Sequence, residues 1–329
     1  MKDYSSGSHP PGYSIPDKKS TKVGTNALFL GDVSERDKPW DKHRGNSDKV
    51  ANHYRGTKEF KQYATRIDFC SQLLDFKLIP EHKTGELKFK LDTARFCRVR
   101  HCPVCQWRRS LMWKAKAYKI LPLVVEAYPK HRWLFLTLTI RNCAIVELRD
   151  TLQWMNQSWR RMAQRKKFPA IGWIRSTEVT RGKNGSAHPH FHCLLLVKPS
   201  YFSGQSYMKQ KEWVELWKSC LRIDYNPILD IRPVKRGHQP MELIPEILKY
   251  CVKESDLVVD REWFLELTRQ MHKMRNVATG GVLKEYLRQL EEEPEDLIGK
   301  NESETEEEID EGHIYSAWEY EVKKYKIVD

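Results

Sequence analysis

The stretch from residue 186 to residue 197, SAHPHFHCLLLV, constrains the fold of this 329-residue chain more than any other segment. Histidines occupy every second position, at His188, His190 and His192, and an unbroken apolar run follows. Alternate side chains of a β-strand share one face, so the three imidazoles would point the same way. The other face carries residues that suit a core, Phe191, Cys193, Leu195 and Val197. The pattern predicts a buried strand with a row of histidines.

The histidine row allows two interpretations. A buried strand can satisfy its imidazoles by hydrogen bonds alone, but three in register favour a metal site, because imidazole is the commonest protein metal ligand. If the preceding turn is centred on Asn184, Glu178 pairs with His190 and lies beside His192. Two imidazoles and a carboxylate suit Mn²⁺ or Mg²⁺. His188 is then a further ligand, a group that orients a ligand, or a phosphate contact.

Strand and helix signals alternate around this stretch. The sequence predicts strands at Arg132–Ile140, Ile171–Thr180 and Ile228–Val234, and helices at Leu148–Met162 and Trp213–Leu221. With the histidine strand the order is β-α-β-β-α-β, which predicts an α+β fold with a split antiparallel sheet and helices packed on one face. One more helix is expected over MELIPEILKYCVKES, residues 241–255.

The charge distribution indicates a partner rich in phosphate. The chain has 57 basic and 44 acidic residues, but 12 of the acids and one lysine lie in residues 291–311, which leaves a net charge of +24 on the rest. Eleven tryptophans favour nucleic acid over a membrane surface. No stretch approaches the roughly 18–20 apolar residues of a membrane span, and the early ALFL is too short for a signal-peptide core. We therefore expect a cytoplasmic protein that binds nucleic acid and no membrane.

The segment PEILKYCVK contains a candidate nucleophile. Glu246, Tyr250 and Lys253 are spaced by four and three residues, so they share one stripe of the expected helix. A phenol has a pKa near 10, and attack on phosphate therefore needs a metal and a nearby cation, which Lys253 could supply. Glu246 could act as a base. The same spacing is also common for surface ion pairs.

Three motifs together resemble those of a known family. FLTLT followed by Asn142, then HPHFH, then Y-x-x-K stand in the order found in HUH endonucleases, and the similarity spans residues 66 to about 256. More narrowly, the chain resembles the rolling-circle plasmid replication initiators of the pUB110/pC194-like family. The resemblance implies an HUH-type sheet, a metal held by His190 and His192, and attack by Tyr250 that leaves a 5′-phosphotyrosine and a free 3′-hydroxyl. In such proteins a glutamate at the position of Glu246 is associated with a hydrolytic terminating step.

The resemblance also implies partners. These are plasmid origin DNA, double- and single-stranded, and a host DNA polymerase and helicase; the chain has no P-loop motif of its own. Two other functions remain open. A transposase or mobilisation relaxase uses similar motifs, and a zinc-bearing DNA-binding regulator could retain the residues without the activity.

Four cysteines form a candidate zinc site. Cys97, Cys102 and Cys105 have the spacing C-x4-C-x2-C, and Cys70 is a plausible fourth ligand, with His82 or His101 as alternatives. Closely spaced thiolates in a cytosolic protein favour zinc over a disulfide, and the similar proteins carry corresponding cysteines. The alternative is buried reduced thiols, which we assume for Cys143, Cys193, Cys220 and Cys251.

Composition completes the expected domain organisation. We expect a disordered arm over 1–50, a cysteine-rich zinc-binding and DNA-contact region over 51–125, the HUH nuclease domain over 126–260, a helical extension over 261–290, an acidic disordered segment over 291–313 and a tail over 314–329. Candidate phosphate contacts near the cysteines, which could equally be solvated surface, are Arg98, Arg100, Arg108 and Arg109. The acidic segment would compete with DNA for the basic face.

Overall fold

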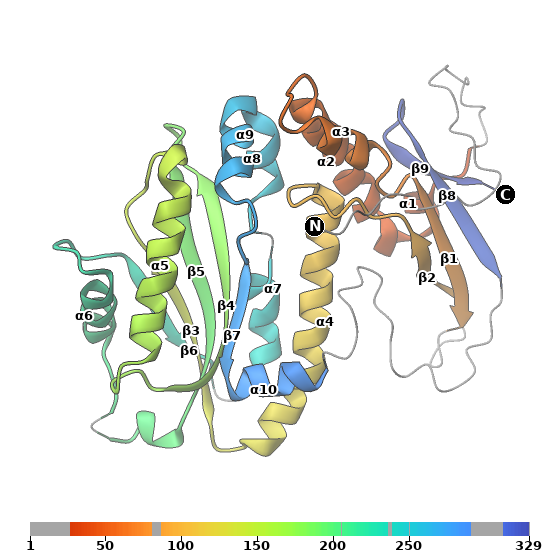
Figure 1. The fold of residues 1–329 in the computed structure, drawn as a ribbon. Helices are drawn as coiled ribbons and strands as arrows, with labels where there is room; N and C mark the ends of the chain where they lie inside the picture. Colours follow the sequence, from red (N-terminus) through yellow and green to blue (C-terminus); the bar gives the residue numbers. More distant parts are fainter. Residues whose placement is uncertain are drawn as a thin grey trace.

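The structure, a computed structural model, describes residues 27–80, 87–204, 206–235, 239–249, 251–290 and 312–328. Two antiparallel sheets lie on either side of the long helix α4, Pro103–Ala127 (Figure 1). The expected α+β class is therefore confirmed. Within the described ranges, no helix is both long and apolar enough to cross a membrane.

The larger sheet has five strands in the order β6-β3-β5-β4-β7. Their bounds are β3 Arg132–Thr139, β4 Ala170–Arg181, β5 Ala187–Val197, β6 Leu229–Pro233 and β7 Val277–Gly281. The helices α5, Leu148–Ala163, and α6, Gln210–Leu221, follow β3 and β5 along the chain, in the order expected from the sequence. The histidine strand β5 is central, and all but one of its residues are buried.

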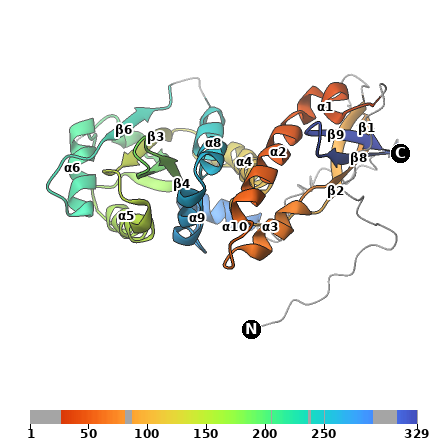
Figure 2. The ribbon, with the colours of Figure 1, turned by 90° about the horizontal axis from the view of Figure 1, so that it is seen from above.

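Helices cover both faces of this sheet, so the expectation of helices on one face is wrong. On one face Phe191 and Val197 of β5 join the core formed with α5 and α6. On the other, Leu194 and Leu196 pack with residues of α4, of α7 (Ile244–Ile247) and of α10 (Val282–Gln289). The two helical layers are seen from above in Figure 2. The apolar half of the histidine face needs this second layer because it would otherwise be exposed to water.

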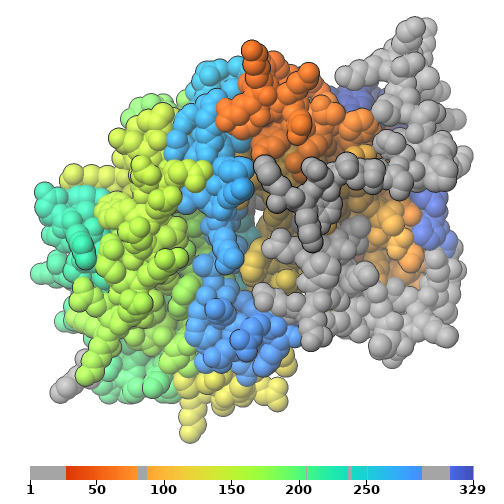
Figure 3. Space-filling model, in the orientation of Figure 1, coloured from red at the N-terminus to blue at the C-terminus, as the bar shows by residue number. Residues whose placement is uncertain are grey.

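The expected helical extension over residues 261–290 contains a strand. Helices α9, Arg261–Gln270, and α10 flank β7, which pairs with β4 from Gly172 to Ser176. Two glycines at its end allow close packing: a Cβ at Gly280 would collide with the Trp173 ring, and Gly281 has φ +56°. Residues 261–290 form a blue band between α5 and the orange N-terminal helices (Figure 3).

The smaller sheet pairs strands from residues 73–94 with the two C-terminal strands. Its order is β2-β1-β8-β9, with β1 Leu73–Pro80, β2 Leu87–Ala94, β8 His313–Glu319 and β9 Lys324–Val328. The expected tail over 314–329 is thus a pair of strands, because Trp318 and Tyr325 are buried and the Tyr325 hydroxyl donates to the Ser71 carbonyl at 2.6 Å.

Helices begin inside the expected disordered arm. The first are α1, Leu30–Val33, α2, Pro39–Tyr54, and α3, Lys61–Asp68. The polar sequence of α2 conceals one apolar stripe, since Trp40, Val50 and Tyr54 are buried. Residues 1–26 and the acidic segment 291–311 lie outside the described residues.

The expected helix over 241–255 is broken. Helix α7 ends at Ile247, and α8, Glu254–Val259, begins only after Lys253. Between them the backbone is drawn to the edge of β4, where the Val179 amide donates to the Cys251 carbonyl at 2.8 Å and Val179 forms a parallel bridge with Val252. Cys251 and Val252 are both buried. This edge contact replaces the helical bonds that the residues would otherwise make.

Candidate active site

Glu178 and two histidines converge at the centre of the large sheet. The expected register is confirmed, since Glu178 of β4 lies opposite His190 of β5. Glu178 Oε2 lies 3.0 Å from the Nε2 atoms of both His190 and His192. All three side chains are buried, and their ligand atoms are close enough together to hold one ion. A carboxylate and two imidazoles are donors that Mn²⁺ accepts, and Mg²⁺ also accepts the carboxylate, so the residues fit such a cation.

Lys249 completes this cluster, and sequence reasoning missed it. Its Nζ lies 2.7 Å from Glu178 Oε2, and its side chain is about one-third exposed. Lys249 reaches Glu178 only because the chain leaves the helical path after Ile247. Burial raises the pKa of Glu178, but hydrogen bonds from His190, His192 and Lys249 outweigh it and hold that pKa well below its usual range.

Residues of the first motif orient the histidines. Thr137 Oγ1 lies 3.3 Å from His192 Nδ1, so the nitrogen facing Glu178 is the other one, Nε2. Asn142 Oδ1 lies 2.7 Å from His188 Nδ1. His188 is not part of the group of ligand atoms around Glu178. Such partners of the outer ring nitrogen fix the imidazole orientation.

The residues expected on one helical stripe are separated. Glu246 is exposed on α7, and Lys253 is exposed at the N-cap of α8. Tyr250 lies outside the described residues. The residues before and after it in the sequence are both attached to β4, Lys249 through Glu178 and Cys251 through Val179.

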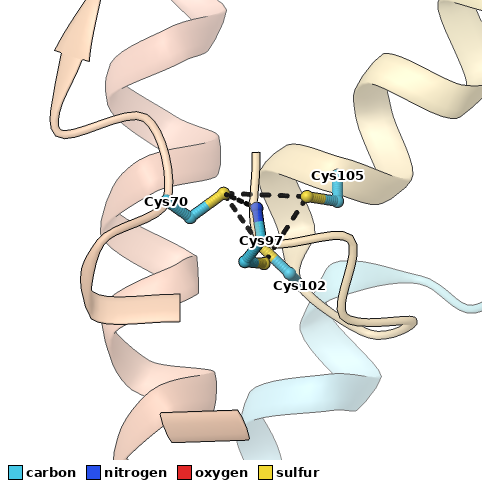
Figure 4. A group of neighbouring side chains, drawn as sticks. All are labelled: Cys70, Cys97, Cys102 and Cys105. Carbon is cyan, nitrogen blue, oxygen red and sulfur yellow. Dashed lines mark hydrogen bonds between the residues drawn. The ribbon is translucent and has the colours of Figure 1, made fainter. Parts of the chain in front are cut away.

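Four thiols meet at the start of α4 (Figure 4). Cys70 Sγ lies 3.6 Å from Cys105 Sγ and 3.7 Å from Cys102 Sγ, and the Cys97 and Cys105 sulfurs are 3.6 Å apart. All four are buried and free of disulfides. A tetrahedral zinc with Zn–S bonds of about 2.3 Å separates its sulfurs by roughly 3.8 Å, so the cluster fits zinc.

The backbone around the thiols is shaped for such a site. Ser71 and Arg98, each one residue after a cysteine, have φ +49° and +56°. The Cys97 amide donates to Cys70 Sγ at 3.4 Å. His101 is buried but is not a member of the cluster, and His82 lies outside the described residues. Cys70 therefore supplies the fourth sulfur.

Comparison with known proteins decides the family. The family model described as "Replication protein" matches residues 88–326, which is more than half of the chain. The chain belongs to the replication protein (Rep) family. It is 33% identical to a "Protein rep" of Bacillus amyloliquefaciens over 87% of this chain and 93% of that protein. It is 34% identical to a "Protein rep" of Streptococcus pneumoniae serotype 2, over 78% of this chain and 81% of that protein. No solved structure matches the chain.

Membership of the Rep family confirms the resemblance to rolling-circle plasmid replication initiators and places the chain in plasmid replication. Both the histidine strand and three of the four thiols fall inside the matched residues. Cys70 precedes them, but the first relative covers enough of the chain to extend beyond the family model.

The four candidate arginines of this Rep family member differ in how freely their side chains could contact DNA phosphate. Arg98 is exposed. Arg100 is bound to the Met274 carbonyl and, at 2.8 Å, to Asn276 Oδ1, and Arg109 donates to the Arg98 carbonyl at 2.9 Å. Arg108 lies over the rings of Trp40, Phe96 and Trp107. Arg100 and Arg109 therefore brace the loop between the thiols and the sheet, whereas Arg98 faces solvent.

Proposed function

We propose that this Rep family member is a metal-dependent, HUH-type endonuclease that starts rolling-circle replication by nicking one strand of the plasmid origin. One observation carries the proposal: both residues that flank Tyr250 in sequence are attached to β4 next to the buried group of Glu178, His190 and His192. Lys249 binds Glu178 itself, and Cys251 binds its neighbour Val179. A ligand group and a nucleophile-bearing segment are thus brought to one edge of β4.

The chemistry follows from these residues. A cation held by Glu178, His190 and His192 would polarise a phosphate oxygen of the bound strand. The Tyr250 oxygen attacks phosphorus, forming a phosphotyrosine at the 5′ side, and the bond to the 3′ oxygen breaks. The 3′ oxygen takes up the proton that the Tyr250 hydroxyl loses and leaves as a hydroxyl that primes a host polymerase, while a host helicase separates the strands. Glu246, exposed on α7, is the proposed base for terminating hydrolysis.

The remaining candidate residues support DNA binding in this proposal. Structural zinc at Cys70, Cys97, Cys102 and Cys105 fixes the loop that carries Arg98 and the start of α4. Arg98 contacts phosphate of double- or single-stranded origin DNA. Lys249 holds the Glu178 carboxylate in place.

Nicking of single-stranded oligonucleotides tests the proposal. End-labelled oligonucleotides tiled across the replicon that encodes this chain are incubated with the full chain and Mn²⁺ or Mg²⁺, or with EDTA. We expect one cleavage position, a 3′-hydroxyl end, and loss of cleavage with EDTA or with His190→Ala. The matched control is His131→Ala, which lies at the far end of the sheet and should cleave like the wild type. A folded chain that binds DNA but cleaves no oligonucleotide would favour the noncatalytic regulator.

A further inference from the structure

A pocket of about 60 Å³ opens beside the candidate metal group. It lies between α4, the broken segment after α7, and the junction of β4 with β7. Six of the residues that line it have polar or aromatic side chains that could contact a ligand: Gln106, Arg109, Trp113, Ser176, Lys249 and Asn276. One buried water needs about 10–15 Å³ by this measure, so the space suits a small planar ring.

The pocket adjoins the site of the proposed cleavage. Lys249 lines it and binds Glu178. Ser176 also lines it, and lies opposite His192 in the sheet, one alternate position along the strand from Glu178. If a phosphate of single-stranded DNA binds at the group of Glu178, His190 and His192, a neighbouring nucleotide would therefore lie at the mouth of the pocket.

Among the residues that line the pocket, Gln106 is buried with a hydrogen-bond donor that has no partner in the part of the chain that the structure describes. Gln106 is 5% exposed, and its Oε1 accepts a hydrogen bond from the Cys251 thiol at 3.1 Å. Its Nε2 finds no acceptor among the described residues. A buried amide donor without a partner is costly, and a ligand acceptor in the pocket would relieve that cost.

The lining favours a neutral ring over a phosphate. Its two cations are already engaged, Lys249 with Glu178 and Arg109 with the carbonyls of Arg98 and Arg100. Trp113, half-buried on α4, offers an aromatic surface on which a base can stack. Amide and hydroxyl groups around it match the polar edges of a nucleobase.

We propose that this pocket receives one unpaired base of the single-stranded DNA next to the cleavage position, stacked on Trp113 and hydrogen-bonded by Gln106. The inference rests on the proposed function, since that function brings a single strand to Glu178. Trp113 and Gln106 would then help to select which DNA strand is bound, in addition to any contacts that the protein makes with phosphate.

Abasic scanning tests the inference by affinity and not by cleavage. The tightest-binding single-stranded oligonucleotide of the tiled set is resynthesised with one abasic site at each position in turn. Dissociation constants for the full chain are measured by fluorescence anisotropy in EDTA. We expect one position at which base removal weakens binding roughly 10-fold in the wild type. In Trp113→Ala and Gln106→Leu the same removal should cost little, because the pocket no longer holds the base.

Two further variants separate this role from a structural one. Trp113→Phe should restore part of the sensitivity, and Tyr118→Ala, an exposed aromatic on the same helix outside the pocket lining, should behave as wild type. An abasic profile that is flat, or that is unchanged in Trp113→Ala, overturns the inference, as does an absence of single-strand binding. Cleavage by the wild type, measured in parallel, shows separately whether the nuclease proposal holds.

Discussion

At the scale of single residues, Glu178 is the side chain on which the site depends. It accepts hydrogen bonds from His190, His192 and Lys249 within a buried sheet. A carboxylate so placed is stabilised in its charged form, and its depressed pKa links the folded state to pH.

Glu178→Gln should therefore change how stability depends on pH. The folded-state pKa of Glu178 lies below the ordinary value of about 4.3, so the charged form adds stability above that pH, and the gain is lost as the pH falls through the lower folded value. In EDTA, urea unfolding should show the wild type more stable than Glu178→Gln at pH 6, with the difference shrinking towards pH 3. An equal difference at both values would contradict the assigned ionisation.

Thr137→Val removes the hydrogen bond to His192 Nδ1 at nearly constant volume. Loss of an orienting partner typically weakens metal binding about 10- to 100-fold. Calorimetric titration with Mn²⁺ measures the metal affinity of the variant and of the wild type. Thr139→Val is the control, because Thr139 Oγ1 donates to the Ile228 carbonyl and not to a ligand. Equal affinities in both variants would show that Thr137 does not orient His192.

Sequence reasoning reached part of this residue-scale picture. Period-two alternation and a symmetric turn were enough to place Glu178 opposite His190. The FLTLT motif contains Thr137, so its contact with His192 could have been found from the pairing of β3 with β5. The contact of Lys249 with Glu178 could not have been found in this way, because it depends on the end of α7 at Ile247, which the local periodicity does not predict.

At the scale of elements, the thiol cluster joins three segments that also share an apolar core, with Ile67, Val99 and Val104 buried in it. Cys70 follows α3, Cys97 lies in a loop, and Cys102 and Cys105 begin α4. Spacing indicated Cys97, Cys102 and Cys105 as zinc ligands and left Cys70, His82 and His101 open as the fourth. Helix α2 was missed because its polar faces hide the buried stripe.

Cys70→Ser should release zinc and destabilise this junction. We expect about one zinc per chain in the wild type and a free energy of unfolding lowered by roughly 3 kcal/mol or more in the variant. Elemental analysis and urea unfolding measure the two effects. Cys143→Ser, which alters a half-buried thiol outside the cluster, should keep its zinc. A wild type purified without chelators that carries no zinc would contradict the assignment.

At the scale of the whole molecule, the C-terminal strand β8 pairs with β1, more than 200 residues earlier in the sequence. Helix α10 packs beside the larger sheet and ends at Gln289, whereas β8 starts at His313 in the smaller sheet. A buried hydrogen bond between the side chains of His43 and Glu254 also connects α2 to α8. Long-range strand pairing of this kind leaves no signal in the local sequence pattern, which is why residues 314–329 were expected to form only a tail.

Replacing residues 291–311 by a neutral linker of equal length should tighten nonspecific DNA binding. The replacement removes 12 acidic groups from the vicinity of a body with net charge +24, and it leaves β8 able to reach β1. Dissociation constants for a random duplex at several fixed salt concentrations measure the effect. Unchanged affinity at every salt concentration would show that the segment does not compete with DNA.

In the proposed mechanism, Tyr250 forms a covalent bond to DNA beside the group of Glu178, His190 and His192. The measurement is denaturing-gel trapping of the adduct with Mn²⁺, followed by mass spectrometry of the tryptic peptide that carries the nucleotide. We expect a 5′-phosphotyrosine at residue 250 that is absent in Tyr250→Phe and in EDTA. DNA attached to any other residue, or an adduct that persists in Tyr250→Phe, would contradict it.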